Sequence, residues 1–157
     1  MVAQGRGNEL VVVSGYEPPE EAHRLIEFRQ RNLAGFATVN AALKNFEPRT
    51  VFSWHLSVQI VYDDKDENQL PSANEQNLLY SFEDGLDLAF KQNGDVVFLA
   101  RVTHDGRREI LWRTRNPEAT DSVLRDMLRE KSYPREFDYR IDHDPKWEKA
   151  EWYLQSV

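Results

Sequence analysis

The feature that most constrains the fold of this chain is an alternation of large apolar residues with mostly polar ones between Phe52 and Tyr62. The apolar positions of this run are Phe52, Trp54, Leu56, Val58, Ile60 and Tyr62. The residues that alternate with them are Ser53, His55, Ser57, Gln59 and Val61. Because successive side chains of a strand point to opposite faces of a sheet, this pattern predicts a strand with one face buried against a core.

Two helices are predicted from the signals at their N-termini. Ser72 with Glu75 three residues later is a capping-box pattern, which predicts a helix that ends near Gln92. Its predicted buried stripe is Leu78, Leu79, Phe82, Leu86, Ala89 and Phe90, and its predicted outward acids are Glu83, Asp84 and Asp87. The segment Asn116–Glu118 offers an N-cap, a proline at the first helical position and an acid in the first turn. A second helix should therefore run to about Lys131.

The remaining patterns complete an α+β order. Strands are predicted over Asp95–Thr103, Arg107–Arg115 and residues 136–142. Strand, helix, strand, strand, helix, strand is the order of a ferredoxin-like β-α-β-β-α-β sandwich, with both helices on one face of the sheet. Asp144-Pro145 predicts the start of a short C-terminal helix. That helix would carry Trp147, Trp152 and Leu154.

The chain before the alternating strand is less clearly patterned. We expect residues 1–20 to be a loose N-terminal segment that ends at a Pro-Pro break, and residues 21–157 to form a single domain. Phe36, Val39, Leu43 and Phe46 recur at helical spacing. The stretch Arg24–Leu43 also fits two short strands around Leu33-Ala34-Gly35, so its spacing alone leaves helix and hairpin open.

Composition limits the classes of protein that this chain fits. It has 157 residues, 40% of them apolar and 30% charged, as in ordinary globular domains. It has no cysteine, which excludes disulfides, zinc-thiolate sites and a cysteine nucleophile. We expect a cytoplasmic protein, because no apolar run fits a signal peptide or a membrane span. The net charge of −7 would repel a long phosphate backbone, and it suits solubility in general and a basic partner in particular.

The densest polar chemistry lies in the hairpin predicted between Arg101 and Arg115. A two-residue turn, Asp105-Gly106, would pair Val102 with Glu109 and Phe98 with Arg113. A three-residue loop that includes His104 would pair Phe98 with Trp112, Ala100 with Ile110 and Arg101 with Glu109. We expect the second register, because it gives one apolar face and one ion pair. Phe98, Ala100, Val102, Ile110 and Trp112 would then face the helices.

The opposite face of the sheet would carry Arg101, Glu109, Leu111 and Arg113 in that register. A face with arginines, a carboxylate and a leucine offers a contact surface for a partner. The sequence leaves open whether the N-terminal segment covers this face instead.

Motifs that would define an enzyme or a metal site are missing. His104-Asp105 and Asp142-His143-Asp144 contain ligand types but lack a metal-ligand spacing such as His-Glu-x-x-His. There is no nucleophile elbow, phosphate-binding glycine loop or dinucleotide fingerprint. Nucleic-acid binding is disfavoured because Trp112 would point inward, away from the arginines. We therefore expect no catalytic residues, no cofactor, no metal and no nucleic acid.

The span from about Arg24 to Leu154 resembles the family called domain of unknown function 695. The resemblance lies in WHLSVQIVY, LLYSFEDGL, LARVTHDGRREILWR and FDYRIDHDPKW. It implies a ferredoxin-like α+β fold, a hairpin before the first long strand and no established activity, so it supplies no catalytic residues. Such domains are distantly similar to RraB-type inhibitors of ribonuclease E.

The function expected from these observations is non-enzymatic binding of a protein partner, most concretely by an immunity protein that occludes a bacterial toxin. Glu83, Asp84 and Asp87 would attract a basic partner, and the contact area would come from Arg101, Glu109, Leu111 and Arg113. One alternative is a regulator of an RNA-processing enzyme that acts by protein contact. Another is an anion-binding domain or enzyme that uses Arg101, His104 and His143.

Overall fold

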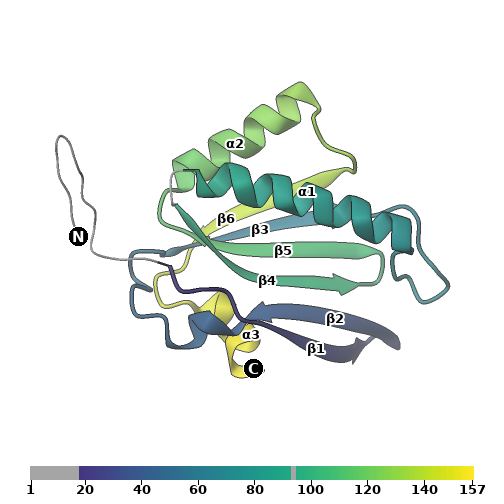
Figure 1. Ribbon diagram of the computed structural model, residues 1–157, viewed down its shortest axis with the longest axis horizontal. Helices are drawn as coiled ribbons and strands as arrows, with labels where there is room; N and C mark the ends of the chain where they lie inside the picture. The colour runs from purple at the N-terminus through teal and green to yellow at the C-terminus, as the bar shows by residue number, and fades with distance from the viewer. Residues whose placement is uncertain (1–17, 93–94) are drawn as a thin grey trace.

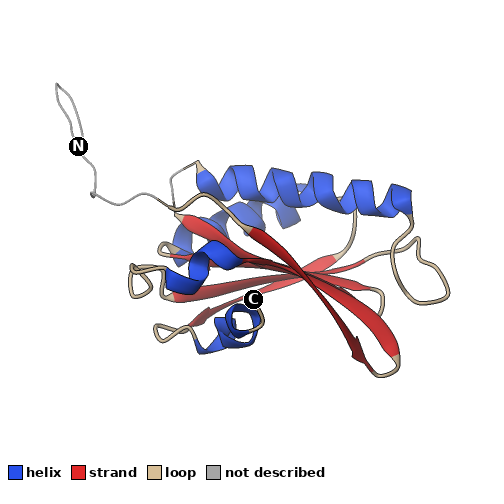
Figure 2. Ribbon diagram, turned by 60° about the horizontal axis from the view of Figure 1, so that its bottom comes forward, coloured by secondary structure: helices blue, strands red, loops and turns tan. Residues whose placement is uncertain are grey.

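A computed structural model describes residues 18–92 and 95–157, in which one six-stranded antiparallel sheet is flanked by helices on both faces (Figures 1 and 2). The strands are β1 (His23–Gln30), β2 (Leu33–Asn40), β3 (Trp54–Val61), β4 (Val96–His104), β5 (Arg107–Thr114) and β6 (Phe137–His143). The helices are α1 (Ala73–Lys91), α2 (Pro117–Glu130) and α3 (Glu151–Gln155), and the 3-10 helices are η1 (Ala41–Asn45) and η2 (Glu148–Ala150). The strand order in the sheet is β1-β2-β4-β5-β3-β6.

The elements from β3 to β6 appear in the predicted order, and both predicted N-caps are present. The Ser72 hydroxyl accepts a hydrogen bond from Glu75 N at 3.2 Å, and the Asn116 side chain accepts one from Ala119 N at 3.1 Å. Figure 1 shows α1 and α2 together on one face of the sheet and α3 on the other. No helix in the described parts of the chain is long and apolar enough to cross a membrane.

The stretch Arg24–Leu43, for which the spacing allowed either a helix or a hairpin, contains the β1–β2 hairpin. Its turn is Arg31-Asn32, with φ of 54° and 64°, rather than the predicted position around Leu33-Ala34-Gly35. Phe28 lies opposite Gly35, whose missing side chain leaves room for the aromatic ring. β2 then pairs with β4, which extends the sheet beyond the region that α1 covers. Of the predicted loose segment 1–20, residues 1–17 lie outside the described residues.

The register of the β4–β5 hairpin corrects the prediction. The turn is the two-residue Asp105-Gly106, with φ of 50° and 77°, and Val102 pairs with Glu109. Phe98 nevertheless pairs with Trp112, because a β-bulge at Leu99 inserts one extra residue into β4. Each of the two registers considered is therefore right at one end of the hairpin. An alternating pattern gives no sign of such a bulge, so the sequence predicts one register for both ends of the hairpin.

The bulge changes which β4 side chains face the helices. Phe98 packs in the core below α1 and α2, as predicted, but Ala100 and Val102 pack on the opposite face of the sheet. Arg101 points toward α1 instead, where it meets Glu83 rather than the predicted partner Glu109. A one-residue insertion thus reverses the facing of the whole outer half of β4.

The face opposite α1 and α2 holds a second apolar core. The residues of this core are Ala37, Val39, Leu43, Phe46, Phe52, Val97, Leu99, Ala100, Leu111, Trp147, Ala150 and Leu154. Among the described residues, the covering elements are η1 with the segment that follows it and the C-terminal η2 and α3. The predicted open contact face is therefore wrong where Leu111 and Arg113 lie, since both side chains are buried.

Arg113 ties this C-terminal cover to the sheet. Its Nη1 donates to the Asp144 carboxylate at 2.8 Å and its Nη2 to the Asp144 carbonyl at 2.6 Å. Its guanidinium also lies 4.5 Å from the centre of the Trp147 ring. The Asp144 carboxylate in turn accepts hydrogen bonds from Glu148 N and Lys149 N, both at 3.0 Å. The first turn of the terminal helical segment is η2, which begins at Glu148, later than the start predicted at Asp144-Pro145, and Trp147 precedes it with a φ of 60°. Arg113 is a buried structural partner instead of a contact residue.

Candidate functional site

The three acids predicted to face outward on α1 occupy three different environments. Glu83 is buried and bonded to Arg101, so the prediction of an exposed acid is wrong there. Asp84 is exposed, as expected. Asp87 is half-buried, accepts the Trp112 indole N–H at 2.9 Å and pairs with Lys91 at 2.9 Å. The three side chains do not form one continuous acidic surface.

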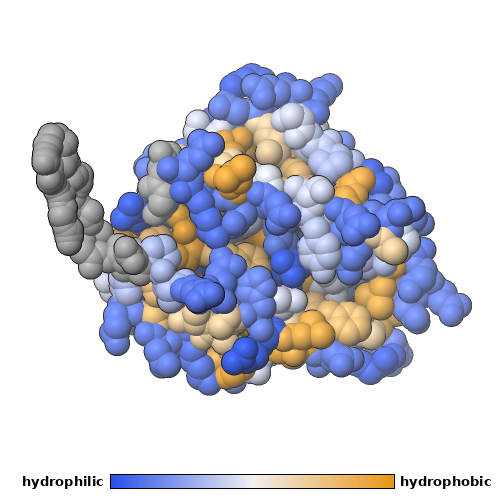
Figure 3. All heavy atoms as spheres, in the orientation of Figure 1, coloured by the Kyte–Doolittle hydropathy of each residue, from blue (hydrophilic) through white to orange (hydrophobic). Residues whose placement is uncertain are grey.

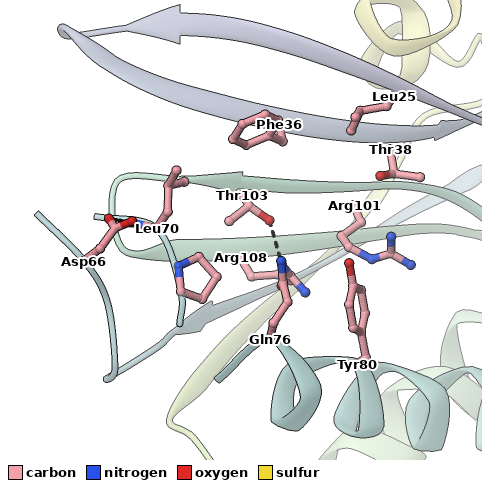
Figure 4. A pocket seen from close by; sticks show the side chains of 11 residues that line it. Leu25, Phe36, Thr38, Asp66, Leu70, Gln76, Tyr80, Arg101, Thr103 and Arg108 are labelled. Carbon is pink, nitrogen blue, oxygen red and sulfur yellow. Dashed lines mark hydrogen bonds between the residues drawn. The ribbon is translucent and has the colours of Figure 1, made fainter. Parts of the chain in front are cut away.

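A pocket of about 410 Å³ lies between α1 and the β1–β2 hairpin (Figure 4). Strands β4 and β5 form its floor through Arg101, Thr103 and Arg108, and α1 supplies Gln76 and Tyr80. Its remaining lining is Leu25, Phe36 and Thr38 from the hairpin and Asp66, Leu70 and Pro71 from the loop before α1. In Figure 4 the side chains from the two hairpins, from α1 and from the loop before it converge on one space.

The loop that closes one end of this pocket is held by hydrogen bonds to the sheet. The Tyr62 hydroxyl donates to the Gln69 carbonyl at 2.5 Å, and Gly106 N donates to the same carbonyl at 3.0 Å. Asp66 Oδ1 accepts from Asn68 N and Leu70 N, which folds the loop back on itself. The end wall is therefore anchored to the tip of the β4–β5 hairpin.

Arg101 is the first cation of the pocket, and it has an anionic partner. Its Nε and Nη2 donate to the two Glu83 carboxylate oxygens at 2.7 and 2.6 Å, a bidentate pair. Burial opposes the charge on this guanidinium, but the Glu83 hydrogen bonds outweigh that effect and raise its pKa. The guanidinium also lies 4.9 Å from the centre of the Tyr80 ring.

Arg108 is the second cation, and its charge is not matched. Its side chain is almost completely buried, at 1% exposure. Nε donates to the Thr103 hydroxyl at 3.0 Å and Nη2 donates to the Gln76 side-chain oxygen, but both of these acceptors are uncharged. Nη1 is buried and has no hydrogen-bond partner among the described residues. Burial lowers the pKa of this guanidinium, the direction expected for a poorly compensated buried cation.

Tyr80 connects the two arginines. The centre of its ring lies 4.9 Å from the Arg101 guanidinium and 5.2 Å from that of Arg108. Figure 4 shows the ring reaching from α1 toward the strands between the two side chains. The negative faces of an aromatic ring favour cations, but they supply far less stabilisation than a carboxylate would. The ring orients both guanidinium groups and leaves Arg108 with a net charge to be matched.

The other predicted site residues lie outside this pocket. His104 Nε2 lies 2.9 Å from the Gln30 carbonyl, and the His143 ring stacks on Trp54 at 4.5 Å. Glu109 accepts a hydrogen bond from the Ser57 hydroxyl on the opposite face of the sheet. Arg101, His104 and His143 are therefore not brought together as an anion site. No three His, Asp or Glu side chains within residues 18–92 and 95–157 are grouped as ligands for a metal ion.

Sequence reasoning missed Arg108 as a site residue, although a signal was present. Arg108, Ile110 and Trp112 occupy alternate positions of β5 and share its helix-facing side. An arginine on the apolar side of a half-buried strand needs either a partner or a function. Thr103 and Arg101 gave no comparable signal, because their facing depends on the bulge.

The fold and the pocket define an α+β protein with a six-stranded antiparallel sheet and an arginine-containing pocket beside it. The chain matches the family described as Family of unknown function (DUF695) over residues 20–155, and it belongs to that family. No curated protein and no solved structure matches the chain.

Proposed function

We propose that this protein is a non-enzymatic binding domain that holds an anionic group of its ligand in the pocket between α1 and the β1–β2 hairpin. The observation that carries the proposal is the Arg108 guanidinium, which is buried and has one nitrogen, Nη1, without a partner among the described residues. Each unmatched buried charge costs several kcal/mol, roughly, and a bound anion would remove that cost. The proposal is a form of the anion-binding alternative considered from the sequence, with Arg108 in place of His104 and His143.

The test is thermal denaturation at constant ionic strength with acetate, inorganic phosphate and 3-phenylpropionate added in turn. A ligand that binds only the folded state raises the Tm. We expect at least one of these anions to raise the Tm of the wild-type protein but not that of Arg108→Met. Arg107→Met is the matched control, because it removes the same charge from an exposed position on the same strand. Equal responses of wild type and Arg108→Met would refute an anion site at Arg108.

We propose as a second function that the protein binds and occludes a protein partner, such as a toxin or an RNA-processing enzyme, through the outer face of α1. Leu88 is 69% exposed and lies one turn after the exposed Asp84. An apolar side chain beside an acid suits contact with a basic, partly apolar surface. Capture of one partner by wild type and by Arg108→Met, but not by Asp84→Lys or Leu88→Glu, would support this function. Capture by all four proteins would exclude this face.

We also propose that β3 to β6 with α1 and α2 form a ferredoxin-like unit, to which the β1–β2 hairpin adds two strands. The sheet order β4-β5-β3-β6 and the two helices on one face support this interpretation. In this view the binding pocket lies where the added hairpin meets the unit.

A further inference from the structure

We propose that the ligand of this pocket is a small monocarboxylate that carries an aromatic or branched apolar group, with its carboxylate bound by Arg108. This inference rests on the proposed anion site and specifies the charge and the shape of what enters it. Three observations carry it: the charge balance around Arg108, the hydrogen-bond partners of its three nitrogens and the apolar lining of the pocket mouth.

The charge balance favours an anion with a single charge. The ionic groups beside the pocket floor are Arg101, Arg108 and Glu83, and Glu83 forms its ion pair with Arg101, whose side chain is 15% exposed. One positive charge therefore remains in the interior. A carboxylate neutralises it, whereas a phosphate dianion would leave a buried negative charge in its place. Asp66, exposed at the far end of the pocket, adds a negative charge that further disfavours a dianion.

The hydrogen-bond geometry also fits a carboxylate. Nε and Nη2 of Arg108 are occupied by Thr103 and Gln76, which fixes the plane of the guanidinium. Nη1 is the nitrogen that stays without an acceptor, and it carries two N–H groups. Because Nη1 is buried, a carboxylate oxygen would accept from it after a neighbouring side chain of the pocket moves aside. The site thus needs one small acceptor, in contrast to the several donors that surround a bound phosphate.

The apolar lining identifies the other half of the ligand. Leu25 is 66% exposed and Tyr80 is 38% exposed at this pocket, and both are large apolar side chains. Phe36, Leu70 and Pro71 line the same space, and Figure 3 shows apolar residues breaking the hydrophilic surface near the β1–β2 hairpin. A volume of about 410 Å³ lies in the range of small-molecule sites. A ligand that covered Leu25 and Tyr80 would bury apolar surface that otherwise faces water.

The experiment is calorimetric titration of the full chain with four probes: 3-phenylpropionate, its neutral analogue 3-phenylpropan-1-ol, acetate and inorganic phosphate. We expect 3-phenylpropionate to bind at least about tenfold more tightly than each of the other three, which corresponds to one charge-assisted hydrogen bond or one buried ring. Arg108→Met should abolish the advantage of 3-phenylpropionate over its alcohol, and Arg107→Met should retain it. Glu83→Gln raises the charge of the site by one unit, so phosphate should gain affinity relative to 3-phenylpropionate.

The outcomes separate this inference from the function on which it rests. If phosphate binds more tightly than 3-phenylpropionate and its binding depends on Arg108, the monocarboxylate proposal is wrong but the proposed anion site remains. Equal affinities for acetate and 3-phenylpropionate would overturn the apolar part alone. Absence of any Arg108-dependent anion binding would overturn both proposals. If Arg108→Met does not fold, Leu25→Glu serves in its place, because it puts a negative charge at an exposed position of the mouth and should weaken 3-phenylpropionate at least about tenfold.

Discussion

Replacing either of two buried arginines on β5 by methionine should change the free energy of unfolding in opposite directions. Arg108 and Arg113 are 1% and 0% exposed, and both lie on β5. Arg113 is matched by the Asp144 carboxylate, whereas the described hydrogen-bond partners of Arg108 are uncharged. Replacement by methionine keeps much of the side-chain volume and removes the charge, so it measures how well each charge is compensated.

We expect Arg108→Met to stabilise the ligand-free protein. The substitution loses hydrogen bonds to Thr103 and Gln76 and the contact with Tyr80, together worth about 2 to 3 kcal/mol. It also removes an unpaired buried cation, whose desolvation costs several kcal/mol, roughly. The net gain should be about 1 to 2 kcal/mol, or a rise in Tm of roughly 2 to 8 °C for a domain of this size.

Arg113→Met should instead destabilise the protein. It removes the hydrogen bonds to the Asp144 carboxylate and carbonyl and leaves that carboxylate buried without its cation. Breaking a buried pair in this way costs about 3 to 5 kcal/mol, or roughly 6 to 20 °C in Tm. The assay is urea denaturation followed by circular dichroism, with thermal melting alongside. A loss of stability in Arg108→Met as large as that in Arg113→Met would refute the argument that Arg108 is uncompensated.

Further predictions concern other parts of the sheet. Burial and the neighbouring Arg113 guanidinium lower the pKa of His55 to about 4, so the unfolded state takes up a proton at a higher pH than the folded state. The free energy of unfolding present above pH 6.5 should therefore fall by about 2 to 3 kcal/mol by pH 4.5. His55→Gln should remove this loss in denaturation curves measured at the two pH values. Gly35→Ala places a Cβ 2.3 Å from the Phe28 ring and should cost about 1 to 2 kcal/mol in urea denaturation; an unchanged midpoint would show that the ring moves freely. Glu83→Gln should cost about 2 to 4 kcal/mol because it leaves a buried arginine unpaired, and Asp84→Asn should stay within about 0.5 kcal/mol by the same assay; equal effects would contradict the burial difference.

The sequence by itself determined the elements from β3 to β6. Alternation over residues 52–62 specifies the strand β3, although His55 and Ser57 on its polar face are buried too. The caps at Ser72 and Asn116 specify where α1 and α2 begin. These signals are local: each depends on residues within a few positions of one another, so propensity and periodicity suffice to read them. The resemblance to the family favoured the β1–β2 hairpin where periodicity left two choices.

Only the tertiary structure decided where the polar side chains of the hairpin point. The bulge at Leu99 lies in β4, which pairs with β5 on one side and β2 on the other, and it turns Arg101 from one face of the sheet to the other. The face opposite α1 is covered by segments far along the chain, which buries Leu111 and Arg113. The pocket around Arg108 likewise gathers side chains from three stretches of chain, residues 25–38, 66–80 and 101–108. Periodicity carries no information about contacts between distant segments, and those contacts determine which charges are matched and which one is left for a ligand.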